Sequence, residues 1–255
     1  MSRIISVVNQ KGGVGKTTTA VNLAAYLAHL GNFVLLVDLD PQANATSGAG
    51  IDHKNISAGL YEVLMGPYGL RQVSLPLEPL GLKIIPTNQN LAGANIELAN
   101  APQREYRLHQ ELLEIRHDFD YIIIDSPPSL GLLTINGLVA ADDILIPVQC
   151  EYYALEGLGQ LLNTVSLIKE HLKPDLNILG AVMTMYDERN KLAKEVFNEL
   201  YHYFPNKIFR TVIPRNAKLA EAPSFGKHIL HYDPAGRGAK AYERLARELL
   251  AYTKH

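Results

Sequence analysis

The stretch Ile4–Thr18, IISVVNQKGGVGKTT, decides the fold of this 255-residue chain. Its first part, Ile4–Val8, is a short apolar run that predicts a buried strand, and a helical pattern over Thr17–Leu30 follows the glycines. Glycines at positions 12, 13 and 15 let the backbone turn so that several N–H groups point into one concavity. Such a concavity, followed by a helix N-terminus, attracts phosphate oxygens. Strand, glycine-rich loop and helix in this order predict a phosphate-binding P-loop.

The P-loop pattern assigns roles to single residues. Lys16 can reach the β- and γ-phosphates of a nucleotide, and the Thr17 hydroxyl can ligate Mg²⁺. The general pattern G-x-x-x-x-G-K-[ST] fails at its first position, where Gln10 replaces glycine, while Lys11 adds a second lysine. The alternative is a turn that merely joins strand to helix, but the flanking context favours the nucleotide site. The predicted nucleotide-binding residues are Lys11, Gly12, Gly13, Val14, Gly15, Lys16, Thr17 and Thr18.

Short apolar runs alternate with longer helical patterns along the rest of the chain. Continuous apolar runs are typical of strands buried on both faces, as in a parallel sheet covered by helices. The predicted strands are Ile4–Val8, Phe33–Val37, Leu82–Ile85, Tyr121–Ile124, Ile144–Val148, Ile178–Thr184 and Ile208–Ile213. The predicted helices are Thr17–Leu30, Arg104–Arg116, Leu130–Ala140, Leu155–Glu170, Leu192–Tyr203 and Gly238–Tyr252. We expect a doubly wound α/β fold with a mostly parallel sheet, helices on both faces, and a single domain over residues 1–255.

The stretch Gly66–Gly81 is rich in glycine and proline and is expected to be a surface excursion. In open α/β sheets, ligands lie beyond the carboxyl ends of the strands. Polar residues that directly follow an apolar run are therefore candidates for chemistry.

Three aspartates occupy such positions. Asp38 and Asp40 follow the second predicted strand, and Asp125 ends the run IIID in the pattern of a Walker-B acid. Two carboxylates two residues apart point to the same side of an extended chain, which suits one that orients a water molecule and one near a metal. Asp125 is expected to hold Mg²⁺ through water, with Asp38 in its second shell. Turn or helix capping is the alternative for each aspartate.

Composition and charge limit the classes of function. The chain is 47% hydrophobic with a net charge of −2, which fits a soluble globular protein and does not by itself indicate nucleic-acid binding. A single cysteine, Cys150, excludes an intramolecular disulfide and is expected to be a core residue. No signal peptide or membrane span is predicted, so we expect a cytoplasmic protein. GTPases of this class carry N-K-x-D; the nearest string, NKLA at 190–193, lacks the aspartate, which favours ATP.

Several longer blocks resemble one family. KGGVGKTT, LLVDLDPQANATSG, DYIIIDSPPSLGLLTINGL, PVQCEYYALEGL and IPRNAKLAEAPSFGK are together similar to the ParA/Soj chromosome- and plasmid-partitioning ATPases. The resemblance runs from residue 1 to about residue 250, and the two lysines of the loop are typical of the deviant Walker-A group.

The resemblance implies a mechanism. ATP would drive two subunits face to face, with Lys11 reaching the partner's phosphates and Gly12 at the junction, where a side chain would clash. Asp40 matches the carboxylate associated with hydrolysis, while Pro214 and Asn216 match positions near the adenine. The ATP-bound homodimer would bind DNA without sequence preference. A ParB/Spo0J-type partner would stimulate otherwise weak hydrolysis, on the nucleoid of a bacterial cell.

The charge distribution gives limited support for DNA binding. Residues 187–227 contain eight Lys/Arg and five Asp/Glu, a local charge of +3, although a mildly biased solvated surface would look the same. The resemblance places Arg189 and Lys218 at DNA-linked basic positions, where relatives often have arginine in place of Lys218. Arg215 lies in the same segment and is a third candidate.

Three other functions are alternatives. A MinD-like membrane-positioning ATPase shares the double-lysine loop but needs an amphipathic C-terminal anchor, whereas the C-terminal pattern is expected to be a closing helix of the domain. Stable membrane binding is therefore not expected. A metal-cluster carrier needs paired cysteines, and a small-molecule kinase needs a lid and an acceptor pocket, which the sequence does not reveal.

Overall fold

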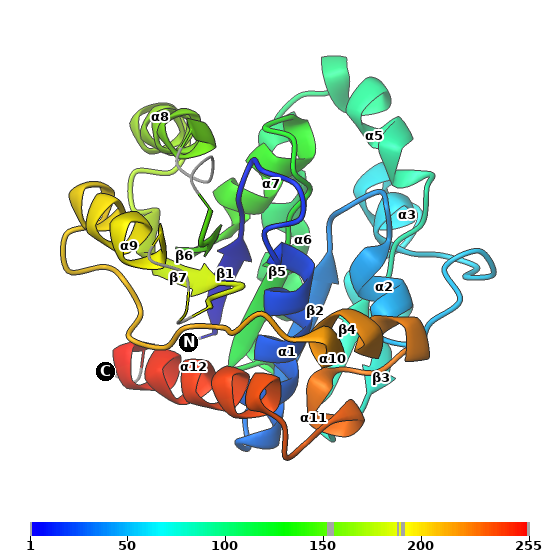
Figure 1. The fold of residues 1–255 in the computed structure, drawn as a ribbon. Coiled ribbons are helices and arrows are strands. Elements are labelled where there is room, and N and C mark those ends of the chain that lie inside the picture. The colour runs from blue at the N-terminus through cyan, green and yellow to red at the C-terminus, as the bar shows by residue number, and fades with distance from the viewer. Residues whose placement is uncertain (1, 152–155, 188, 190–191, 254–255) are drawn as a thin grey trace.

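One twisted sheet forms the centre of the molecule (Figure 1). The computed structural model describes residues 2–151, 156–187, 189 and 192–253. Within these residues, seven strands pair in the order β3-β4-β2-β5-β1-β6-β7, and only β3 runs antiparallel to its neighbour. The strands are β1 (Arg3–Val7), β2 (Val34–Asp38), β3 (Leu75–Leu77), β4 (Leu82–Ile85), β5 (Tyr121–Asp125), β6 (Asp143–Gln149) and β7 (Asn177–Thr184). The predicted doubly wound, mostly parallel fold is confirmed.

Helices cover both faces of the sheet (Figure 1). One face carries α1 (Lys16–His29), α2 (Asn44–Gly48), α10 (Ala217–Glu221), α11 (Ile229–Tyr232) and α12 (Arg237–Thr253). The other carries α3 (Leu60–Met65), α4 (Leu70–Val73), α5 (Leu91–Glu97), α6 (Arg107–Ile115), α7 (Leu132–Ala140), α8 (Glu156–His171) and α9 (Leu192–Tyr203). Each predicted helical pattern overlaps one of these helices.

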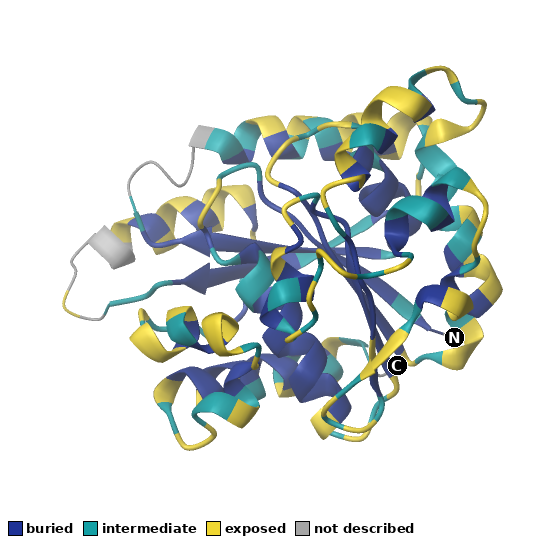
Figure 2. Ribbon diagram, turned by 90° about the vertical axis from the view of Figure 1, so that its right-hand side faces the viewer, coloured by how far each residue is buried: buried dark blue, intermediate teal, exposed yellow. Residues whose placement is uncertain are grey.

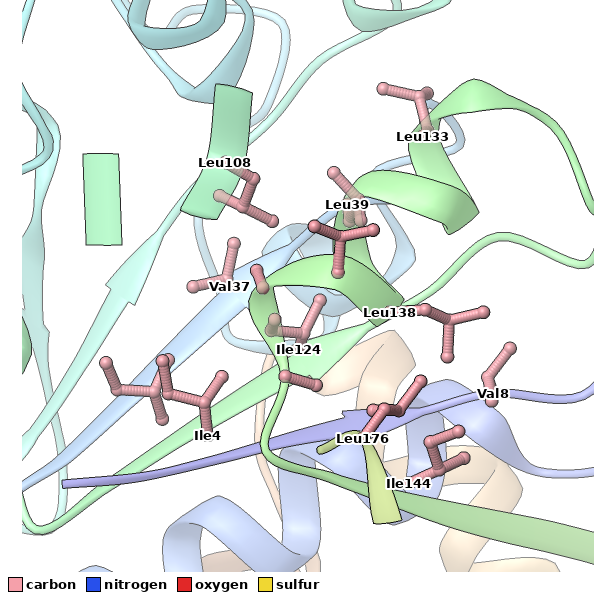
Figure 3. Close-up of a cluster of buried hydrophobic side chains, with 14 of the residues drawn as sticks. Ile4, Val8, Val37, Leu39, Leu108, Ile124, Leu133, Leu138, Ile144 and Leu176 are labelled. Carbon is pink, nitrogen blue, oxygen red and sulfur yellow. The ribbon is translucent and has the colours of Figure 1, made fainter. Parts of the chain in front are cut away.

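The strand side chains alternate between two hydrophobic clusters, one on each face. In β1, Ile4 packs into one cluster and Ile5 into the other, and Leu35 and Leu36 of β2 divide in the same way. Figure 3 shows Ile4 in the first cluster, and in Figure 2 the buried strands lie between helices whose outer sides are exposed. This two-sided burial explains why the strands read as continuous apolar runs. Cys150 is buried, as expected.

The prediction of a strand over Ile208–Ile213 is wrong. This segment lies beside β7 but forms only one isolated bridge with it, Ala181 to Ile208, and a second bridge joins Tyr186 to Pro214 just beyond both segments. The Arg210 and Thr211 N–H groups instead donate to the two carboxylate oxygens of Glu248 on α12, at 2.7 and 3.0 Å. Because these donors are bound by a side chain, the segment forms no continuous ladder.

The prediction of a simple surface excursion over Gly66–Gly81 is also wrong in part. The stretch contains α4 and then β3, which pairs with β4 at the edge of the sheet. An edge strand tolerates Pro76 in its middle, because an edge has one side without ladder partners.

Among the described residues, no helix combines the length and the apolar character that a membrane crossing requires.

Candidate functional site

The glycine-rich loop lies between β1 and α1, as the sequence predicts. Gly13 and Gly15 have φ angles of 74° and 89°, in the left-handed region that glycine adopts readily. Gly15 is the N-cap of α1 and provides no side-chain cap, so the first N–H groups of the helix remain available to an anion. Thr184, the last residue of β7, donates its hydroxyl to the Val14 carbonyl at 2.7 Å. This bond fastens the loop to the end of the sheet.

Lys16 is buried against its own loop. Its side-chain Nζ donates to the Lys11 carbonyl at 2.9 Å, and the residue is only 6% exposed. Burial lowers the pKa of the Lys16 ammonium, whereas the negative charges of Asp125 and Asp40 raise it. Lys16 lines the same cleft as Gly13 and Gly15 of the loop.

Lys11 and Gly12 lie at the more exposed part of the loop. The Lys11 N–H donates to the Asn9 side chain at 3.0 Å. A Cβ added at Gly12 would meet no described atom within 4 Å, and its φ is not left-handed. Nothing in the described part of one chain therefore requires glycine at position 12.

Asp125 is fully buried at the end of β5, and both of its carboxylate oxygens lack a hydrogen-bond partner among the described residues. Burial raises the pKa of Asp125 well above its usual value, and the charge of Asp38 adds to the effect. The nearby Thr17 hydroxyl and the Lys16 charge favour the ionised form, but the Thr17 hydroxyl forms no hydrogen bond with either oxygen. Buried carboxylates are normally paired, so an unpaired one beside a P-loop threonine suits a cation.

Asp38 lies beside Asp125 in the sheet register but has a different environment. Its carboxylate accepts hydrogen bonds from the Thr46 N–H at 2.8 Å, the Thr46 hydroxyl at 2.6 Å and the Asp40 N–H at 3.2 Å. Burial still raises the pKa of Asp38 to about 6. These contacts make Asp38 an anchor for the loop between β2 and α2. Its position near a metal stays a prediction.

Asp40 lies in the loop that Asp38 anchors and is 6% exposed. One carboxylate oxygen accepts the Gln42 N–H at 2.9 Å, and the Asp40 carbonyl accepts the Ala43 N–H at 2.8 Å. The side chain lines a cleft of about 560 Å³ together with Lys16 and Thr17. The fold therefore brings the predicted hydrolytic carboxylate to the phosphate loop.

A second cavity of about 370 Å³ adjoins the first. Pro214 and Asn216, the predicted adenine neighbours, both line it. Gly15, Thr18 and Met185 line both cavities. Volumes of a few hundred Å³ are typical of small-molecule sites. Sequence reasoning did not identify Met185, which carries no motif signal, or the roles of Thr46 and Thr184, whose contacts join distant segments.

The three candidate DNA-binding residues are exposed and each is paired with an acid. Arg189 forms an ion pair with Asp187 at 2.8 Å and lowers the pKa of that carboxyl to about 2. Arg215 pairs with Glu151 at 3.3 Å, and Lys218 pairs with Glu221 at 2.8 Å. The Arg215 N–H donates to the Tyr186 carbonyl at 3.0 Å, which joins the segments of Arg215 and Arg189. The NKLA string at 190–193 lies partly outside the described residues.

Comparisons with known proteins agree with this geometry. The family model described as an AAA domain matches residues 2–178. The chain is 53% identical over 251 residues to the sporulation initiation inhibitor protein Soj of Bacillus subtilis, which covers 98% of this chain and 99% of that protein. It is 50% identical over 250 residues to the chromosome partitioning protein ParA of Myxococcus xanthus, with 98% of this chain and 88% of that protein covered.

A solved structure of cobyrinic acid a,c-diamide synthase from Mycobacterium smegmatis, with bound ATP analog and magnesium, superposes with a TM-score of 0.90 at 38% identity. The superposition covers 100% of this chain and 96% of that one. The cell division ATPase MinD of Pyrococcus furiosus superposes with a TM-score of 0.79 at 26% identity, covering 98% of this chain and 99% of that one.

Full-length identity near 50% to Soj and ParA proteins, together with a P-loop that faces a Walker-B aspartate, leads to one conclusion: this chain belongs to the Soj/ParA family of chromosome-partitioning ATPases.

Proposed function

We propose that this chain is an ATP-dependent dimerising switch that binds DNA non-specifically as the ATP-bound dimer. A ParB/Spo0J-type partner stimulates hydrolysis and so releases the dimer from DNA. One observation carries this proposal. The segment 213–220 lines the second cavity with Pro214 and Asn216 and exposes Arg215 and Lys218 at the surface. Candidate nucleotide and DNA contacts thus alternate along one short piece of chain.

The residues of the cleft fit ATP with Mg²⁺, the cofactors of this ATPase. The two unpaired oxygens of buried Asp125 lack the counter-charge that a cation supplies, and Gly13 and Gly15 shape a concavity for phosphate. Thr17 would hold the ion directly and Asp125 through water, with Asp38 fixing the neighbouring loop. Bound Mg²⁺ neutralises negative charge on the phosphates. Lys16 contributes a second positive charge, and Pro214 and Asn216 border the base.

Hydrolysis is assigned to residues of the chain that surround the phosphates. Asp40 orients the attacking water, because its carboxylate lines the cleft beside Lys16 and Thr17. Lys11 acts on the phosphates of a second copy and stabilises charge in the transition state there. A Cβ at Gly12 would have free space within one chain, so the clash that the family resemblance implies at this position would come from the facing subunit.

DNA binding is assigned to Arg189, Arg215 and Lys218. Their acidic partners are themselves at the surface, and exposed ion pairs contribute little stability, so DNA phosphates can displace them. Each protomer of a dimer would contribute the same basic patch, which raises affinity by multivalency. The chain would act in the cytoplasm on the nucleoid.

A membrane-positioning role is disfavoured by α12. The apolar side of this helix packs inward, with Tyr242, Leu245 and Leu249 at 1%, 0% and 0% exposure. A helix that buries this side in its own core does not offer it to a lipid surface.

The test is equilibrium binding of a fluorescent DNA duplex without nucleotide, with ADP and with ATP·Mg²⁺. The wild type and Asp40→Ala should bind DNA only with ATP, and Asp40→Ala should hold it longer because it hydrolyses little. Asp52→Ala, which changes an exposed aspartate outside both cavities, is the matched control and should behave as wild type. Nucleotide-independent DNA binding would contradict the switch, and pelleting with liposomes in ATP would favour the membrane role instead.

A further inference from the structure

Met185 stands at the border between the two cavities and has an unusual backbone. We propose that Met185 is a nucleotide-contacting specificity residue, whose side chain packs against the ribose and base of the bound nucleoside triphosphate. The proposal rests on the proposed function, since it assumes that the triphosphate occupies the P-loop and the base occupies the second cavity.

The first observation is an irregular ladder at this position. The Ile213 N–H donates to the Met183 carbonyl at 2.8 Å, and the Ile213 carbonyl accepts the Tyr186 N–H at 2.9 Å. A regular parallel ladder would use the N–H of residue 185, two positions after Met183. One extra residue is therefore inserted, which makes a bulge that contains Met185. Bulges occur beside active sites, where they re-aim a side chain.

The second observation is the conformation of the inserted residue. Met185 has φ of 52°, in the left-handed region, although it has a Cβ and no short polar group to stabilise that backbone locally. Both neighbours are fixed: Thr184 is bonded to the P-loop, and Tyr186 is bonded to the segment before Arg215. An unfavourable backbone that its surroundings enforce is a common feature of ligand sites.

The third observation is the position of the residue at the border of the two cavities. Only Gly15, Thr18 and Met185 line both of them among the described residues. Of these, Met185 alone has a long apolar side chain, and its flexible, polarizable thioether can adapt to a flat base. The cavity beyond it is bounded by Pro214 and the buried ring of Tyr242. A nucleotide that spans both cavities must pass Met185, whereas an inorganic triphosphate need not.

The experiment compares Met185→Gly with Met185→Leu by calorimetric titration with ATP·Mg²⁺ and with Mg²⁺-tripolyphosphate. Loss of an apolar contact of this size corresponds to roughly a tenfold or greater loss in affinity. Met185→Gly should weaken ATP at least about tenfold, and should leave tripolyphosphate affinity within about twofold of wild type. Its melting temperature should be equal to or higher than that of wild type, because glycine adopts this φ readily. Met185→Leu should restore most of the ATP affinity.

Gln103→Gly is the control, because Gln103 has the same left-handed backbone with φ of 51° and lines neither cavity. It should relieve the same backbone strain and leave ATP affinity unchanged. The proposal is overturned if Met185→Gly weakens the binding of ATP and of tripolyphosphate equally, because Met185 would then only support the P-loop. It is also overturned if Met185→Gly leaves the ATP affinity unchanged. Failure of the wild type to bind ATP would instead reject the proposed function.

Discussion

Asp125→Asn should stabilise the nucleotide-free protein while it removes magnesium-dependent function. Asp125 is fully buried and neither carboxylate oxygen has a partner among the described residues. Asparagine leaves unpaired polar atoms in the same place but removes the charge, and an unsatisfied buried group costs more than the usual roughly 1–3 kcal/mol when it is charged. Loss of attraction to Lys16 opposes the gain, but the raised pKa of Asp125 shows that the ionised carboxylate is disfavoured in the fold. The expected gain at pH 8 is about 1–3 kcal/mol, or roughly 2–10 °C in Tm.

The stability difference between wild type and Asp125→Asn should depend on pH. Because folding raises the pKa of Asp125, the folded chain holds a proton that the unfolded chain has lost, and stability falls as pH rises from about 4 toward the raised pKa. The advantage of the asparagine variant should therefore be larger at pH 8 than at pH 4.5. Urea unfolding followed by circular dichroism at several pH values measures it.

Asp38→Asn is a matched control in the same register of the sheet. One oxygen of Asp38 accepts the Asp40 N–H and the other accepts two bonds from Thr46, and an amide nitrogen cannot accept either set. Asp38→Asn should therefore gain less folding stability than Asp125→Asn. The reasoning is refuted if Asp125→Asn is less stable than wild type at pH 8, or if its advantage is the same at pH 4.5. Mg²⁺·ATP should raise the Tm of wild type more than that of Asp125→Asn.

Three further changes test other parts of the structure. Gly226→Ala should destabilise by about 1–3 kcal/mol, measured by urea unfolding, because a Cβ there would lie 2.6 Å from the Gly50 Cα and φ is 62°; an unchanged midpoint would contradict the close contact. Glu248→Ala should cost about 1–3 kcal/mol, since two backbone N–H groups lose their acceptor, and Glu243→Ala on the same helix should cost less. Asp187→Asn should tighten ATP-dependent DNA binding by freeing Arg189, and the slope of affinity against salt should steepen; weaker binding would argue against a DNA contact at Arg189.

The central part of the fold follows from sequence because its causes are local. The run from Ile4 to Val8 is apolar except for Ser6, and its apolar side chains fill two clusters on opposite faces of the sheet. The P-loop can be predicted from the sequence for the same reason, since Gly13 and Gly15 supply the left-handed turns within the loop itself. The carboxyl-end rule then brings Asp40 and Asp125 to that loop.

The parts that sequence reasoning missed depend on distant partners. Ile208–Ile213 has the composition of a strand, but Glu248, far along the chain, takes two of its N–H groups. Asp38 is predicted to lie in the second shell of a metal, and its hydrogen bonds with Thr46 and with the Asp40 N–H carry no signal in the sequence. Met185 has no motif at all, because its place depends on a bulge formed against the segment before Arg215.

The most direct test of the switch is the mass of the protein in solution by sedimentation velocity. Asp40→Ala should sediment as a 28.2 kDa monomer without nucleotide and with ADP, and as a species of twice that mass with ATP·Mg²⁺. The double variant Lys11→Ala, Asp40→Ala should bind ATP and remain a monomer, because the lysine acts on the facing subunit. An identical mass in all three nucleotide states, or a dimer that forms without Lys11, would contradict the account.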